Sequence, residues 1–119
     1  MKTTLVLGAT ENTERYGNMA LKRLLKYNHP VKAIGIKEGN VDGVAIQTGT
    51  PALDDIDTVT LYLNPKNQED YLDYIISQKP RRIIFNPGTE NPKLEDLARK
   101  NGIEPIEACT LVMLGTGQY

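Results

Sequence analysis

Short apolar runs that alternate with helix-forming segments constrain the fold of this chain more than any other feature of its sequence. We expect five of these runs to form strands, at residues 5–7, 31–36, 58–63, 82–85 and 103–108. Continuous apolar runs of this length are typical of strands that are buried on both faces of a parallel sheet. The stretch from 42 to 55 is less regular, and we expect only a minor extended piece in it, at residues 44–46.

Segments with helical spacing separate these strands. Residues 17–27 repeat leucine at helical spacing, and further helices are expected to begin at Pro65 and Pro92, because proline suits the first turn of a helix. A parallel sheet with right-handed helical crossovers follows from this order. The sequence therefore predicts an α/β fold in which residues 1–119 form one Rossmann-like, doubly wound domain with a five-stranded, mainly parallel sheet of order 3-2-1-4-5.

The charge balance limits the partners of the chain. Its 14 Lys and Arg residues nearly match its 15 Asp and Glu residues, and the basic residues are scattered along the sequence. We therefore expect no nucleic-acid partner and no membrane partner. The first apolar run is too short for a signal peptide or a membrane span, which favours a cytoplasmic protein. A single cysteine and a single histidine exclude an internal disulfide and a Cys/His zinc cluster.

The sheet order predicts where a ligand binds. In an open α/β sheet the crevice lies at the carboxyl ends of the strands, where the strand order reverses, so the loops that begin at Gly8 and Asn86 should face each other. Gly8 opens a turn into the amino end of a helix, where free N–H groups and a partial positive charge hold phosphates. The loop has neither the G-x-G-x-x-G nor the G-x-x-x-x-G-K-[ST] motif, so it supports neither ordinary NAD binding nor P-loop ATP hydrolysis.

Two basic residues and one further glycine extend this candidate site. Arg15 is the only cation of the first loop and suits a phosphate. Lys37 follows the second strand, where the ribose of a nucleotide lies, and a lysine there suits a phosphorylated ribose. Gly88 permits a close backbone approach, and Asn86 and Thr89 beside it can hydrogen-bond amide groups. Each feature is also consistent with an ordinary βα loop or a solvated surface residue, and the sequence leaves that alternative open.

No catalytic constellation is visible in the sequence. His29 follows a predicted helix, where we expect a capping or surface role, and Cys109 ends the last strand as a small apolar residue. No Ser/His/Asp set, acid–base carboxylate pair or metal-ligand spacing is present. The residues therefore favour binding over catalysis.

Several short motifs occur in a fixed order, namely Val6-Leu7-Gly8-Ala9 with Arg15, Lys37, residues 51–56, Asn64-Pro65 and Asn86-Pro87-Gly88. In this order they resemble the stand-alone CoA-binding domain family, which is similar to the amino-terminal domain of the succinyl-CoA synthetase α subunit. The resemblance spans nearly the whole chain. It implies that the first loop holds the CoA phosphates, that the turn after the second strand lies near the adenosine, and that the next two loops border adenine and pantetheine. The site residues that it implies are Gly8, Ala9, Thr10, Arg15, Lys37, Asn64, Pro65, Asn86 and Gly88.

The leading hypothesis is non-catalytic binding of coenzyme A or an acyl-CoA at the switch-point crevice. One alternative is an NAD(P)-binding, oxidoreductase-like domain, in which Lys37 meets a 2′-phosphate. Another is an interaction module with a vestigial nucleotide pocket, whose apolar tail at residues 111–114 docks on a protein partner or on a second copy of the chain. The same tail is also consistent with packing over the edge of its own sheet.

Overall fold

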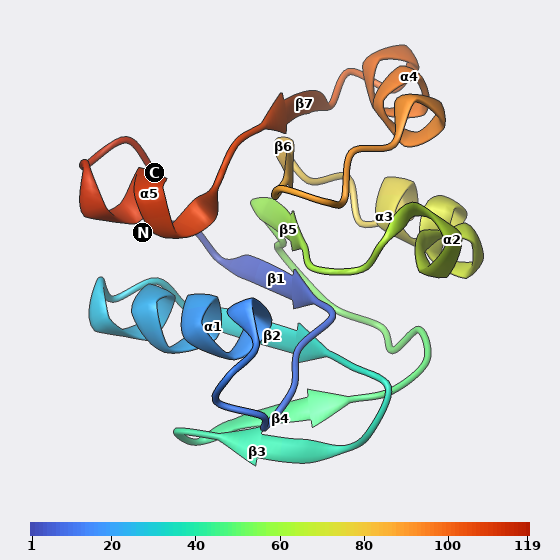
Figure 1. The fold of residues 1–119 in the computed structure, drawn as a ribbon. Coiled ribbons are helices and arrows are strands. Elements are labelled where there is room, and N and C mark those ends of the chain that lie inside the picture. The colour runs from blue at the N-terminus through green and yellow to red at the C-terminus, as the bar shows by residue number, and fades with distance from the viewer.

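The centre of the structure is a seven-stranded sheet, which the computed structural model of residues 1–119 shows in the order β3-β4-β2-β1-β5-β6-β7 (Figure 1). Its strands are β1 (Thr4–Leu7), β2 (Val31–Ile34), β3 (Gly39–Val41), β4 (Val44–Gln47), β5 (Thr58–Leu61), β6 (Arg82–Phe85) and β7 (Glu104–Glu107). Neighbouring strands are parallel, except for the antiparallel pair of β3 and β4. The fold is therefore a mostly parallel α/β sheet, as predicted.

Helices cover both faces of this sheet. They are α1 (Tyr16–Lys26), α2 (Pro65–Gln68), α3 (Leu72–Ser77), α4 (Pro92–Lys100) and α5 (Thr110–Gly115), with a 3₁₀ turn at Glu69–Tyr71 between α2 and α3. The helices α1 and α5 lie on one face, and α3 and α4 lie on the other (Figure 1). None of these helices is long and apolar enough to cross a membrane.

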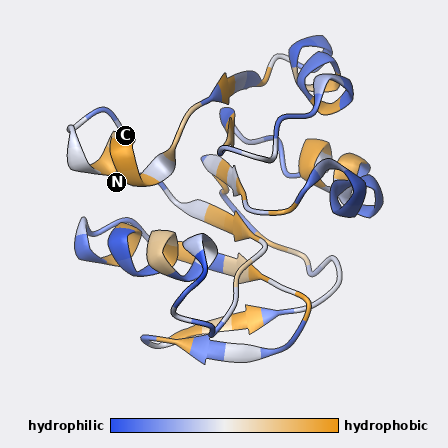
Figure 2. Cartoon of the chain, viewed as in Figure 1, coloured by the Kyte–Doolittle hydropathy of each residue, from blue (hydrophilic) through white to orange (hydrophobic).

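The sheet is buried on both faces, as its apolar runs predict. In β1, Leu5 and Leu7 belong to the core cluster under α3 and α4, whereas Val6 belongs to the cluster under α1 and α5. Figure 2 shows hydrophobic residues along β1 and β4 and hydrophilic residues over α2 and α4. Because successive side chains of a strand point to opposite faces, a slip of one residue would exchange the two sets, and burial on both sides fixes the register.

The predicted five-stranded order 3-2-1-4-5 is wrong. Two additional strands, β3 and β4, form a hairpin at the edge, and β4 pairs in parallel with β2, where Ala33 faces Ile46. This hairpin occupies the position beside β2 that we expected for the third run, so β5 pairs with β1 on its other side. Asp42 and Gly43 form the hairpin turn with positive φ angles of 49° and 89°, a conformation that an Asp-Gly pair favours. The direction of the sheet order therefore reverses between β1 and β5.

The carboxyl-terminal segment packs on the sheet of its own chain. Leu114 of α5 and Tyr119 are buried in the core cluster under α1 and α5. Tyr119 lies at the amino ends of the strands, where its hydroxyl shares a hydrogen bond with Thr4 and its ring centroid lies 4.4 Å from the guanidinium carbon of Arg82. This position agrees with the packing alternative for the apolar tail. Val112 remains 60% exposed, and docking of the tail on a partner or a second copy stays a prediction.

His29 lies at the same end of the sheet, in positively charged surroundings. Its Nδ1 accepts a hydrogen bond from the backbone N–H of Lys2 at 3.0 Å, and its ring centroid lies 4.8 Å from that of Tyr119. Burial lowers the pKa of His29, and the positive charges of the N-terminus, Lys2 and Arg82 lower it further, against a smaller raising effect of Asp57. The folded protein therefore holds His29 in its neutral form more strongly than the unfolded chain does.

We expect His29 to make stability depend on pH in the weakly acidic range. Because the unfolded chain binds a proton at His29 more readily, stability is lost as the pH falls below about 6.5, the ordinary pKa of histidine. Thermal unfolding followed by circular dichroism at about pH 7.5 and about pH 5.5 measures this loss. The variant His29→Asn keeps an acceptor for Lys2 but does not titrate, so its midpoint should change less. Equal changes in the variant and the wild type would contradict the role of His29.

Candidate functional site

A cleft of about 870 Å³ lies at the carboxyl ends of the central strands. The loops that follow β1, β2, β5 and β6 form it, at the point where the sheet order reverses. Its volume falls within the range of small-molecule sites, roughly 300–1,000 Å³. The residues that line it are 8–12, 14–17, 36–38, 62–64, 67 and 87–89.

Two glycines bring the first loop close to its neighbours. Gly8 has a φ of +106°, and a Cβ atom on it would lie 2.8 Å from the carbonyl carbon and oxygen of Tyr62. A Cβ atom on Gly17 would lie 2.6 Å from the carbonyl oxygen of Gly8. Side chains are not tolerated at such distances, so glycine is what allows the end of β1, the start of α1 and the end of β5 to meet.

The amino end of α1 presents unpaired donors at the cleft. The backbone N–H groups of Tyr16 and Gly17 have no hydrogen-bond partner, and Arg15 at the N-cap position makes no side-chain capping bond. All three residues line the cleft. The positive end of the helix dipole reinforces these donors. This arrangement suits an anionic group such as a phosphate.

The first loop is held in shape by its own polar side chains. The buried Asn18 side chain donates from Nδ2 to the carbonyl oxygen of Thr10 at 2.9 Å. Thr10 Oγ1 accepts from the N–H of Asn12 at 3.1 Å, and Asn12 Oδ1 accepts from the N–H of Glu14 at 3.0 Å. Sequence reasoning did not single out Asn12 or Asn18, although Asn and Thr commonly form such local turns. These bonds order the loop without any contribution from a ligand.

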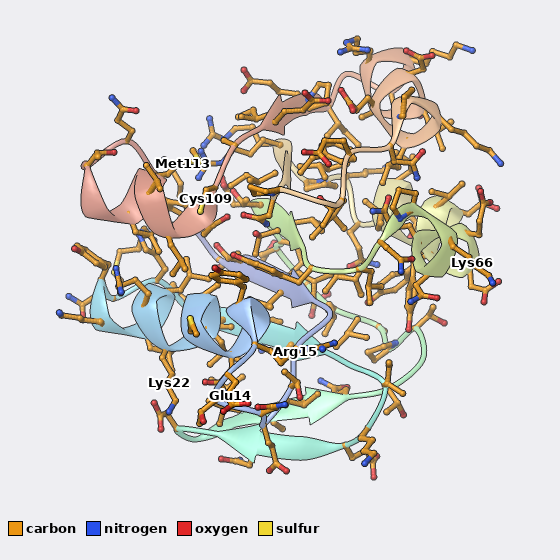
Figure 3. All side chains as sticks on the ribbon, viewed as in Figure 1. Glu14, Arg15, Lys22, Lys66, Cys109 and Met113 are labelled. Carbon is orange, nitrogen blue, oxygen red and sulfur yellow. The ribbon has the colours of Figure 1, made fainter.

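Two unpaired cations lie on the rim of the cleft. Arg15 and Lys37 are exposed, and neither takes part in an ion pair. Figure 3 shows Arg15 on the loop between β1 and α1, with Glu14 next to it. The carboxylate of Glu11 bonds to the edge hairpin, because its Oε2 accepts a hydrogen bond from the N–H of Asn40 in β3 at 2.9 Å. The carboxylates that share the lining are those of Glu11, Glu14 and Glu38. An anionic ligand is thus favoured only close to Arg15, Lys37 and the start of α1.

An apolar pocket of about 180 Å³ continues the cleft between the loops after β2 and β5. Ile36, Leu63 and Tyr71 supply apolar walls, and Ile36 is 84% exposed, so its side chain is accessible from solvent. Gly8 and Asn67, together with Ile36 and Leu63, line both the pocket and the larger cleft. This composition suits a flat ring of a ligand that also occupies the cleft.

Most of the predicted site residues meet in this cleft. Those that line it are Gly8, Ala9, Thr10, Arg15, Lys37, Asn64 and Gly88. Pro65 and Asn86 do not line it. Pro65 is the first residue of α2, and Asn64 caps this helix by accepting a hydrogen bond from the N–H of Asn67 at 2.9 Å. Ligand contact by any of these residues stays a prediction.

Asn86 holds the sheet together at the end of β6. Its buried side chain donates from Nδ2 to Thr60 Oγ1 at 2.7 Å and to the carbonyl oxygen of Leu61 at 2.8 Å. Its Oδ1 accepts from the N–H of Thr110 at 2.8 Å. The side chain therefore links β5, β6 and α5, and its hydrogen-bonding groups are used within the protein.

The loop that lies nearest the first loop differs from the predicted one, because the strand order differs. The strand β5 lies between β1 and β6, so the neighbouring loop begins at Tyr62 and not at Asn86. The loop after β6 still reaches the cleft, through residues 87–89. The loops after β5 and β6 therefore both border the cleft together with the first loop and the loop after β2.

Tyr62 lines the cleft, and its hydroxyl points away from solvent. This hydroxyl is buried without a hydrogen-bond partner. Burial raises the pKa of Tyr62 well above its usual range, and nearby Cys109 raises it further, so the phenol stays neutral. Cys109 is half-buried at the N-cap position of α5. No group of three or more His, Cys, Asp and Glu side chains is arranged to hold a metal ion.

The sheet order and the cleft at its switch point define a Rossmann-like α/β domain. The chain belongs to the CoA-binding domain family, whose model matches residues 2–115, and the predicted resemblance is confirmed. No curated protein matches the chain.

Solved structures share this fold. The crystal structure of an uncharacterized protein is 50% identical, covers 100% of this chain and 98% of its own, and has a TM-score of 0.97. A Thermus thermophilus protein is 18% identical over 99% of this chain and 90% of its own, with a TM-score of 0.86. A hypothetical protein from Pyrococcus horikoshii OT3 is 24% identical over 97% of this chain and 82% of its own, with a TM-score of 0.85. The last two similarities concern the fold alone.

Proposed function

We propose that the cleft binds coenzyme A or an acyl-CoA and catalyses no reaction on it. The observation that carries this proposal is the amino end of α1, where the N–H groups of Tyr16 and Gly17 are unpaired and Arg15 is free of ion pairs. Membership of the CoA-binding domain family supports the choice of ligand. Phosphates are the groups that such a helix end binds best.

In this proposal each part of CoA has its own partner in the cleft. The pyrophosphate binds at the start of α1, along the loop that contains Gly8, Ala9 and Thr10. The adenine ring stacks against Ile36 and Tyr71 in the apolar pocket. The 3′-phosphate of the ribose pairs with Lys37, which lies on the same rim. The pantetheine arm runs between Asn64 and Gly88, where backbone amides and side-chain amides can bond to its amide groups. Pro65 and Asn86 support the loops without touching the ligand.

A second candidate is NADP, because Lys37 also suits a phosphate at the 2′ position of a ribose. CoA carries its ribose phosphate at the 3′ position and ends in a flexible thiol arm, whereas NADP ends in a second nucleotide. In both hypotheses Lys37 and the start of α1 bind phosphates. The loop after β6 borders the flexible thiol arm in the case of CoA and the second nucleotide in the case of NADP. Direct comparison of the two ligands distinguishes the hypotheses.

Thermal unfolding with CoA, dephospho-CoA, NAD, NADP and ATP tests the proposal. A ligand that binds only the folded state stabilises it by about 2.7 kcal/mol at 100 times its dissociation constant. We expect CoA to raise the midpoint most, and dephospho-CoA to raise it less, because it lacks the phosphate that pairs with Lys37. A larger rise of the midpoint with NADP than with CoA would favour the NAD(P)-binding, oxidoreductase-like alternative. No shift with any nucleotide would contradict a nucleotide site and favour an interaction module.

A further inference from the structure

The buried amide of Gln68 joins two of the loops that form the cleft. Gln68 is the last residue of α2, and its side chain is fully buried. Its Nε2 donates to the carbonyl oxygen of Leu63, after β5, and to that of Thr89, after β6, each at 2.8 Å. Its Oε1 accepts from Nδ2 of Asn91 at 2.9 Å. Both donor hydrogens of the amide and one side of its oxygen are therefore in use.

This connection lies beyond the end of the strand ladder. The pairing of β5 with β6 ends at Leu61 and Phe85. After this point the chain leaves each strand for a different helix, α2 or α4. Asn91 is the N-cap residue of α4, and its bond to Gln68 ties the start of that helix to the end of α2. One side chain thus bonds to both loops and, through Asn91, to the second helix.

Gln68 does not line the cleft, whereas Leu63 and Thr89 do. We propose that Gln68 is a positioning residue, which sets the separation of the loops after β5 and β6 and thereby the affinity of the cleft for the pantetheine arm. This inference rests on the proposed function. A cleft whose walls are fixed before binding loses less entropy when the ligand arrives, so a residue that fixes them strengthens binding without touching the ligand.

Removal of the amide leaves the groups that bond to it without these hydrogen bonds, and two of the three bonds are buried. The carbonyl oxygens of Leu63 and Thr89 and the amide of Asn91 would each lose the bond that they make with Gln68. Unpaired polar groups in a protein interior are strongly unfavourable, so the loops are expected to move until water reaches these groups. That movement changes the width of the cleft between Leu63 and Thr89.

The variant Gln68→Met tests this role, because it keeps an unbranched side chain and removes all three hydrogen bonds. Thr58→Val is the matched control, since Thr58 is also fully buried and bonds to Asp57 and Arg82, but at the opposite end of β5. Both variants should lower the unfolding midpoint. In calorimetric titrations we expect only Gln68→Met to weaken CoA binding, by about tenfold, which corresponds to about 1.4 kcal/mol.

The affinity for adenosine 3′,5′-bisphosphate distinguishes a positioning role of Gln68 from a purely structural one. This ligand lacks the pantetheine arm, so Gln68→Met should weaken its binding clearly less than that of CoA. Asn91→Ser is a second variant, because serine still caps α4 without adding a charge but is too short to donate to Gln68, and it should weaken CoA binding in the same direction. If Gln68→Met does not fold, the Asn91 variant alone tests the positioning role.

Three outcomes overturn the inference and leave the proposed function intact. One is unchanged CoA affinity in the folded Gln68 or Asn91 variant. Another is an equal loss of affinity for CoA and for adenosine 3′,5′-bisphosphate in Gln68→Met. The third is a loss of CoA affinity in Thr58→Val as large as that in Gln68→Met. If the wild-type protein itself binds no CoA, the proposed function fails, and the positioning role fails with it.

Discussion

Reversal of both rim charges, in the double variant Arg15→Glu and Lys37→Glu, is expected to weaken CoA binding by at least about 100-fold. Each side chain is proposed to contact a phosphate, and a hydrogen bond to a charged group contributes about 1.5–3 kcal/mol. Both side chains are exposed and outside any ion pair, so the free energy of unfolding should hardly change. Calorimetric titration with CoA measures the loss of binding, and urea denaturation measures stability.

Lys22→Glu is the control for a general effect of charge. Lys22 is an exposed lysine of α1 that lies outside the cleft lining, and Figure 3 shows it on that helix, apart from Arg15. This variant changes the net charge in the same direction but should leave CoA binding nearly unchanged at physiological salt concentration. If Lys22→Glu weakened binding as much as Arg15→Glu alone, long-range attraction rather than contact would explain the effect, and the proposed phosphate contacts would be wrong.

The variant Gly8→Ala is expected to destabilise the protein by about 2–4 kcal/mol, because backbone strain and steric overlap act together. Gly8 has a positive φ, and an added Cβ would lie 2.8 Å from the backbone of Tyr62. Relief of this overlap requires the first loop to move away from β5. We therefore also expect weaker CoA binding, measured by titration, in addition to lower stability in urea denaturation.

Gly49→Ala separates the two contributions to this effect. Gly49 also has a positive φ, +72°, but an added Cβ would meet nothing within 4 Å. Strain alone should lower its stability by about 1–2 kcal/mol. CoA binding should stay at the wild-type level, because Gly49 lies outside the cleft lining. Equal destabilisation by the two substitutions would show that the contact between Gly8 and Tyr62 contributes nothing.

The class of the fold could be predicted from the sequence, but the order of its strands could not be derived correctly. Runs such as residues 5–7 and 82–85 are buried on both faces, and burial on both faces is what their composition favours. The hairpin of β3 and β4 is hard to predict because its strands are short and only partly apolar. Its turn contains the Asp42-Gly43 pair, which is typical of a two-residue hairpin turn. Because β4 pairs with the outer side of β2, β5 pairs instead with the free side of β1.

The candidate site was partly predictable for a related reason. Glycine and cations at strand ends, such as Gly8 and Lys37, can be recognised because their chemistry does not depend on distant residues. The roles of Asn86 and Gln68 depend on which side chains the fold brings to them. Asn86 is predicted to contact the ligand, and the fold also bonds its side chain to Thr60, whereas nothing in the sequence singles out Gln68, whose side chain is buried. Polarity alone does not distinguish an amide that binds a ligand from one that joins two loops.

The most direct test of CoA binding in this cleft is a titration of the ¹⁵N-labelled protein with CoA, followed by NMR. We predict saturable shifts that are largest for the backbone amides of residues 8–12, 14–17, 36–38, 62–64, 67 and 88–89, in the loops at the carboxyl ends of β1, β2, β5 and β6. Residues at the opposite end of the sheet, such as His29 and Tyr119, should hardly shift. An absence of saturable shifts at millimolar CoA, or shifts centred on that opposite end, would contradict the account.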